Sequence, residues 1–218
     1  MMKAISCSIL LLVATSTASA AYVMPMIGGG QVGMMGAPMI HADVSFDGTN
    51  IGVVLDTSHD TPMLRPLTPP AEFDPAQPWA VLTGKAYNYQ YAFNPSGFIT
   101  LPVNAGIWVE RISQDAALEV YTRPPAASYT RIFENDGDRF KWSGAMQHNA
   151  YAVLNPTEST YSATYKIYIG DANTGDPLDG YGSANTTWTW TATPIPEPAS
   201  LGVLGLGAML LLRRRCSA

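Results

Sequence analysis

The stretch that decides the fold is STYSATYKIYIG, residues 159–170, where polar and apolar side chains alternate from Thr160 to Ile167. Apolar or aromatic side chains occupy Tyr161, Ala163, Tyr165, Ile167 and Ile169, and polar side chains occupy Thr160, Ser162, Thr164 and Lys166. Successive side chains of a β-strand point to opposite faces, so a period of two predicts a strand with one buried face.

The same period recurs elsewhere in the chain. NTTWTWTA (185–192) sets two tryptophans against threonines, and AYNYQYAF (86–93) sets three tyrosines and a phenylalanine against Asn88 and Gln90. Shorter strands are predicted at 106–112 and 117–123, with a turn at Gln114 and Asp115. Residues 130–146 read as a strand, an Asn-Asp-Gly-Asp turn and a second strand.

The start of the strand-rich region is a predicted hairpin. HADVSF (41–46) and IGVVLD (51–56) flank the turn residues Asp-Gly-Thr-Asn at 47–50. After it, residues 62–79 contain six prolines, which remove backbone donors and fix φ. We therefore expect an extended surface crossing there, neither strand nor helix.

About ten short strands and no sustained helical period predict an all-β fold, an antiparallel β-sandwich with jelly-roll-like order. The sandwich domain is assigned to residues 40–193, within an exported region large enough to bury a core. Residues 21–39 are rich in glycine and methionine and are expected to form a flexible lead-in.

The first twenty residues have the pattern of a cleavable signal peptide. Lys3 precedes an apolar core at 9–14, and the small residues Ala18, Ser19 and Ala20 form an A-x-A site. We expect residues 1–20 to form a signal helix that signal peptidase removes. The remaining region is then exported, with Ala21 as its first residue.

The C-terminal segment 194–218 combines three features. Pro196, Glu197 and Pro198 precede an apolar run at 199–212, and three arginines follow it. Fourteen helical residues span roughly 21 Å, which is short of the roughly 30 Å hydrocarbon core of a bilayer. Because positively charged residues tend to stay on the cytoplasmic side of a membrane, the three arginines would remain in the cytoplasm. We therefore predict a short, marginal transmembrane helix that suits a temporary stop.

This tail resembles the PEP-CTERM sorting signal of bacterial exosortase substrates. The resemblance covers about 24 residues and rests on the Pro-Glu-Pro triplet, the short apolar helix and the basic end, in that order. It implies that exosortase, a membrane protease, recognises the tail and removes it after transient inner-membrane insertion. The sorting residues it implies are Pro196, Glu197, Pro198, Arg213, Arg214 and Arg215.

Charge and cysteine content exclude several classes of function. Without Lys3 and the three C-terminal arginines, eight basic residues face seventeen acidic ones, a formal charge of about −9. Such a domain repels phosphate backbones, so no nucleic-acid partner is expected. Both cysteines, Cys7 and Cys216, lie in the terminal segments, which leaves no disulfide, thiol nucleophile or cysteine zinc site in between.

No motif of a known catalytic type is visible. The three histidines show no short metal-binding spacing, and Ser58, His59 and Asp60 are adjacent in sequence without the geometry of a triad. We predict a non-enzymatic protein without a cofactor. Its predicted place is the cell surface or extracellular matrix, with a structural or interaction role.

Two local features suggest binding. The aromatic stripes could stack on sugars, which makes a module that binds carbohydrate, such as exopolysaccharide, the alternative function; the candidates are Tyr87, Tyr89, Tyr91, Trp188 and Trp190. Core packing is the competing interpretation of these rings, and the one we favour. Asp171, Asn173 and Asp176 are weak candidates for calcium, but their order departs from known calcium loops and is typical of a turn.

Overall fold

The strand predicted from alternation at 159–170 is present as β13 (Thr160–Asp171). The structure is a computed structural model that describes residues 21–26, 37–122 and 128–195. In β13 the apolar positions Tyr161, Ala163 and Tyr165 are buried, whereas the intervening polar positions keep more contact with solvent. The part of the chain that the structure describes is strand-rich and of the all-β class, as predicted.

Within the described residues, β13 belongs to a five-stranded sheet. Its order is β11-β8-β13-β14-β4, with bounds Arg139–Trp142, Ala105–Gln114, Thr160–Asp171, Ala184–Ala192 and Met63–Leu64. Pairing between β13 and β14 runs antiparallel over eight residue pairs, including Tyr161 with Trp190 and Ala163 with Trp188. The two strongest alternating segments of the sequence therefore lie side by side.

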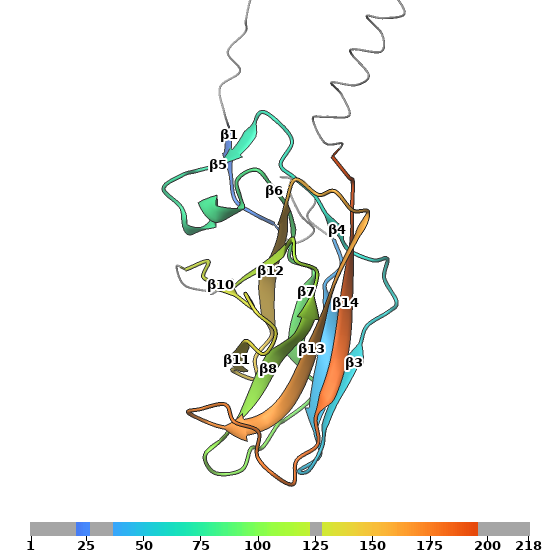
Figure 1. Ribbon diagram of the computed structural model, residues 1–218, viewed down its shortest axis with the longest axis vertical. Coiled ribbons are helices and arrows are strands. Elements are labelled where there is room, and N and C mark those ends of the chain that lie inside the picture. Colours follow the sequence, from blue (N-terminus) through green and yellow to red (C-terminus); the bar gives the residue numbers. More distant parts are fainter. Residues whose placement is uncertain (1–20, 27–36, 123–127, 196–218) are drawn as a thin grey trace, which may run out of the picture.

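A second sheet of seven strands faces the first. Its order is β10-β9-β12-β7-β2-β3, with bounds Arg131–Ile132, Leu118–Thr122, Gln147–Leu154, Tyr91–Pro95, Ile40–Phe46 and Ile51–Leu55. Strand β6 (Lys85–Asn88) also pairs with β12. The predicted hairpin is confirmed, because β2 and β3 pair antiparallel from Ala42–Leu55 to Phe46–Ile51. Figure 1 shows the two layers, with β8, β13 and β14 in front of β12, β7 and β2.

The main hydrophobic core lies between the sheets. It combines side chains of both layers, among them Phe93 and Tyr151 of one sheet and Tyr165, Trp188 and Trp190 of the other. This arrangement is sandwich-like. The prediction of an antiparallel sandwich needs a correction: β2 pairs parallel with β7 and β14 pairs parallel with β4. Residues 56–90 separate β3 from β7, which is long enough for the crossover that parallel pairing needs.

The turns at Gln114–Asp115 and 135–138 join strands of different sheets. Strand β8 lies in the five-stranded sheet and β9 in the seven-stranded sheet, and β10 and β11 are separated in the same way. At the first crossing the Asp115 carboxylate accepts a hydrogen bond from the Ser162 backbone N–H. Each turn therefore connects one sheet of the sandwich to the other and does not form a hairpin within one sheet.

The stretch 86–93, predicted as one strand, forms two. Strand β6 ends at Asn88 and β7 begins at Tyr91, and both pair with β12. The break sends Tyr87 and Tyr89 to a second cluster, while Tyr91 and Phe93 enter the main core. Asn88 and Gln90, predicted on the polar face, are buried at 0% and 7% exposure. They satisfy each other, because Asn88 Nδ2 donates to Gln90 Oε1 at 2.8 Å.

Two further predictions need correction. The proline-rich region contains the short strands β4 and β5 (Ala71–Phe73) and the 3₁₀ helix η1 (Pro78–Leu82). The lead-in begins with a strand, β1 (Ala21–Val23), which pairs parallel with β5; residues 27–36 lie outside the described residues. Such short pieces use few backbone hydrogen bonds, which is why prolines between them are tolerated.

The two described ends of the chain lie at one end of the molecule. Strand β1 and the residues after β14 both lie at the top of Figure 1, and the β7–β8 loop lies at the bottom. The strand registers agree with this placement of the two ends. Trp142 pairs with Ile107 near the start of β8, and Thr160 pairs with Thr191 near the end of β14. We call the lower end, with loops 96–104, 143–146 and 172–183, the distal end. No helix within the described ranges is long and apolar enough to cross a membrane.

Candidate functional site

Three of the five rings proposed for sugar stacking form the centre of the main core. Tyr91 stacks on Trp188 with ring centroids 4.8 Å apart, and it meets Trp190 edge-on at 5.2 Å. Trp188 and Trp190 are 0% exposed and Tyr91 is 5% exposed. The Tyr91 hydroxyl donates to the Thr189 carbonyl at 3.0 Å, which ties the two sheets together. These rings offer no face to a sugar.

The other two rings, Tyr87 and Tyr89, are buried on the outer side of the seven-stranded sheet. They meet edge-on at 5.5 Å, and Phe73 of the proline-rich region packs against Tyr87 at the same distance. The Tyr89 hydroxyl donates to the Tyr129 hydroxyl at 3.2 Å. Both tyrosines are 0% exposed because residues 62–82 cover them, a burial that strand alternation alone could not reveal.

A polar cluster borders this covered face. Lys85 Nζ contacts the Glu119 carboxylate and lies 2.6 Å from the Tyr121 hydroxyl, which in turn donates to Glu119 Oε2 at 2.8 Å. Arg131 adds a weaker contact to Glu119 at 3.6 Å. The sequence analysis missed this cluster because its members come from three strands. Its local signal in the sequence is weak: a single charged residue within a short strand.

The electrostatics of the cluster favour a structural role. Burial lowers the pKa of Lys85, but hydrogen bonds to Glu119 and Tyr121 outweigh burial and raise it above its usual value. A lysine that serves as a nucleophile needs the opposite, a lowered pKa. The cluster therefore links β6 to β9 across β12, the strand with which both pair, as a charged, hydrogen-bonded unit.

The calcium candidates lie in the loop after β13, where their carboxylates already have partners. Asp171 Oδ1 accepts the backbone N–H groups of Asn173 at 2.8 Å and Thr174 at 2.9 Å, which lowers its pKa. Asp176 pairs with Arg139 at 3.0 Å. Lys141 donates to the Ala172 carbonyl at 2.8 Å. Arg139 and Lys141 thus both bind groups of this loop, one a carboxylate and the other a backbone carbonyl.

No group of three or more histidine, cysteine, aspartate or glutamate side chains close enough to hold a metal occurs among the described residues. Of the histidines, His59 lies 3.7 Å from the Asp56 carboxylate. His148 Nδ1 is 2.7 Å from the Tyr89 carbonyl. His59 thus contacts a carboxylate outside the 58–60 stretch, and His148 contacts a backbone carbonyl.

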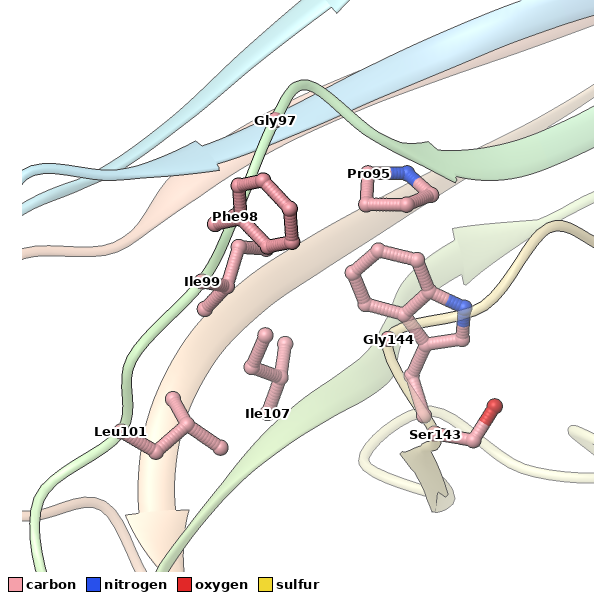
Figure 2. Close-up of a pocket in the computed structure, with 9 residues that line it drawn as sticks. Pro95, Gly97, Phe98, Ile99, Leu101, Ile107, Ser143 and Gly144 are labelled. Carbon is pink, nitrogen blue, oxygen red and sulfur yellow. The ribbon is translucent and has the colours of Figure 1, made fainter.

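An apolar pocket lies at the distal end. It has a volume of about 390 Å³ and nine lining residues, Pro95, Gly97, Phe98, Ile99, Leu101, Ile107, Trp142, Ser143 and Gly144. Figure 2 shows Pro95 and Ser143 on one side and the β7–β8 loop with Phe98 and Leu101 on the other. Trp142 Nε1 donates to the Ala145 carbonyl at 2.8 Å, which fixes the indole.

Exposure differs sharply between the two large rings of this pocket. Trp142 is 2% exposed, whereas Phe98 is fully exposed at the rim. Val103, in the same loop, is also almost completely exposed. The pocket can hold a small apolar group. It presents only the Ser143 hydroxyl as a polar side chain, so it lacks the several directed polar groups that give a ligand site its specificity.

The predicted sorting residues 196–198 and 213–215 lie outside the described residues. Comparison with known proteins adds no assignment: no protein-family model, no curated protein and no solved structure matches this chain.

Proposed function

We propose that this chain is an exported, non-enzymatic protein of the cell envelope or extracellular matrix that is sorted through its C-terminal tail. The observation that carries the proposal is the ordered set of Pro196, Glu197 and Pro198, a 14-residue apolar run and three arginines, in a chain that opens with a signal-peptide pattern. Signal peptidase and exosortase are the processing partners in this proposal.

The fold is compatible with this route. The domain reaches from β2 to β14, and its two described ends lie together at the end opposite the pocket (Figure 1). A leader before Ala21 and a tail after Ile195 would leave from the same side, so the domain could stay folded outside while the tail is held in the inner membrane. The signal helix, the short C-terminal helix and the jelly-roll-like order belong to this proposal as predictions.

The buried state of the candidate rings disfavours the alternative function, a carbohydrate-binding module. The five rings that suggested it are buried, and the distal pocket presents a single polar side chain. An exopolysaccharide partner would have to use other surface groups.

Intact-mass measurement of the protein from cells with active exosortase tests the sorting proposal. The expected species lacks residues 1–20 and residues 213–218. A Glu197→Ala variant should keep its tail, and an Asp179→Ala variant should be processed like the wild type. A wild-type species that retains its arginines in such cells would overturn the proposal.

A further inference from the structure

The four outer edges of the two sheets differ in how they are protected. Natural edge strands avoid pairing with other chains by being short or by carrying charges or prolines. Strands β10 and β4 have two residues each, and the edge strand β11 contains two cations, Arg139 and Lys141. Strand β3, with the sequence Ile-Gly-Val-Val-Leu, is five residues long and has neither charge nor proline. It lies at the right margin of the molecule in Figure 1.

Hydrogen bonds at the two ends of β3 show which backbone groups point outward. The Asp56 N–H donates to the His41 carbonyl of β2 at 2.8 Å. The backbone N–H and C=O groups of residues 52, 54 and 56 therefore point toward β2. The Ile51 N–H donates away from β2, to the Gly182 carbonyl at 3.3 Å. Because antiparallel strands alternate these directions, the N–H and C=O groups of Val53 and Leu55 point to the open side.

These four groups have no hydrogen-bond partner among the described residues. Between them, the Val54 side chain is 71% exposed on the outer surface of the sheet. Among the residues that the structure describes, the edge is bridged at its beginning, where Asn50 pairs with Gly182. The open part of β3 is therefore the three-residue stretch centred on Val54.

We propose that this stretch pairs antiparallel with β3 of a second copy of the chain, around a two-fold axis at Val54. In this register Val53 of one copy lies opposite Leu55 of the other, and all four open groups of each copy form hydrogen bonds. The two Val54 residues form a pair without mutual backbone hydrogen bonds, with Cα atoms about 4.5 Å apart. The two seven-stranded sheets then become continuous.

Self-complementarity selects a second copy as the partner. A two-fold interface needs a patch that matches itself, and three residues with outward groups at both ends satisfy this condition. A register moved by two residues toward the start of β3, with Val53 opposite itself, would need the Ile51 N–H, which already donates to the Gly182 carbonyl. In the proposed register the Asp56 carboxylate lies opposite Gly52, so no like charges meet across the pair. The inference does not depend on the sorting tail.

Disulfide trapping tests the geometry. The whole chain is used in a mild detergent, which keeps the apolar C-terminal stretch dispersed, and Cys7 and Cys216 are replaced by serine in every sample. Val54→Cys should form a covalent dimer under mild oxidation, because a Cα separation of about 4.5 Å allows a disulfide. Val103→Cys, at a 90% exposed position of the distal end, is the matched control. Equal rates of dimer formation would overturn the proposal.

Reversible association is measured on the same serine background by sedimentation over a concentration series. The chain with Val54 intact should dimerise, Val54→Lys should lose the dimer because two cations would meet, and Val103→Lys should keep it. Hydrogen exchange at the amides of Val53 and Leu55 should slow as concentration rises. A monomer at every concentration, including the case in which β3 pairs only with another protein, would overturn the proposal, as would a dimer that survives Val54→Lys.

Discussion

The indole of Trp188 lies flat against the phenol of Tyr91, with centroids 4.8 Å apart and ring planes inclined by 19°. The two residues belong to opposite sheets, and Phe93 adds a third ring 4.6 Å from the same indole. This contact shows that the aromatic stripes of β14 and β7 meet in the interior. Three of the five rings that suggested sugar binding, Tyr91, Trp188 and Trp190, thus pack against one another between the sheets.

Replacing Trp188 with alanine should therefore destabilise the whole domain. Loss of a fully buried tryptophan and the cavity that remains cost about 3–5 kcal/mol of unfolding free energy. Chemical denaturation measures this change. Phe98→Ala is the matched control: its ring is fully exposed, so its effect should stay within about 0.5 kcal/mol. Similar losses for the two variants would contradict the assignment of Trp188 to the core.

The Lys85–Glu119–Tyr121 cluster should make stability depend on acidity. Burial raises the pKa of Glu119, but hydrogen bonds from Lys85 and Tyr121 outweigh it and hold the pKa below its ordinary value of 4.5. A carboxylate with a lower pKa in the folded state stabilises that state above pH 4.5, and this contribution is lost as pH falls through the folded pKa.

Glu119→Gln should accordingly lower the unfolding free energy at pH 7 by about 1 kcal/mol, because hydrogen bonds to a charged group contribute about 1.5–3 kcal/mol and contact with solvent screens part of this. The difference from wild type should shrink as pH falls below 4.5. Glu158→Gln, at an exposed position, should show neither effect. Denaturant titrations at a series of pH values measure both. A Glu119→Gln deficit that is constant between pH 7 and pH 3 would rule out this role of the carboxylate.

A side chain at position 175 should lower the stability of the domain. Its φ is +75°, and a Cβ there would lie 3.0 Å from both the Arg139 Nε and the Trp108 ring. Trp108 cannot easily move, because its Nε1 donates to the Asp171 carbonyl at 3.0 Å. Gly180 has a similar φ of +85° but open space around it. Gly180→Ala should cost about 1 kcal/mol of unfolding free energy for the backbone alone. Gly175→Ala should cost about 1–3 kcal/mol more, since overpacking adds to it.

Thermal unfolding of the two glycine variants gives this difference directly. If they lose the same stability, the close contact of residue 175 with Trp108 and Arg139 is not a constraint.

The buried amide of Asn88 should be required at the junction of β6 and β7. It accepts the Gln90 backbone N–H at 2.8 Å and donates to the Met63 carbonyl at 3.1 Å. Asn88→Ala would leave these buried groups unpaired, a cost of about 1–3 kcal/mol of unfolding free energy. Asn185→Ala, at an exposed position of β14, should be nearly neutral. A neutral Asn88→Ala variant would show that water replaces the amide.

The parts of the fold that the sequence predicted are those governed by local alternation. β13, β14 and the β2–β3 hairpin follow from period two and a turn, because the pleat of a strand assigns alternate side chains to opposite faces without reference to the rest of the chain. The same argument predicted that Trp188 and Trp190 share a face. It could not say that Tyr91 lies opposite, since that contact joins residues almost a hundred positions apart.

The polar cluster and the distal pocket could not be predicted for a related reason. Lys85, Glu119 and Tyr121 come from strands separated by more than thirty residues, and the pocket joins the β7–β8 loop to the end of β11. A pattern within one segment carries no information about which segment becomes its neighbour. Only the strand order of the two sheets brings these residues together.

The sequence by itself determined the strand-rich class, the alternating faces and the expectation of export and tail processing, because each rests on a short contiguous stretch with its own physical signature. The tertiary structure decided which faces became interior, which strands entered which sheet and which edge was left open at Val53 and Leu55. Those outcomes depend on pairing between distant segments, where burial of aromatic rings and satisfaction of backbone hydrogen bonds are decided for the whole domain together.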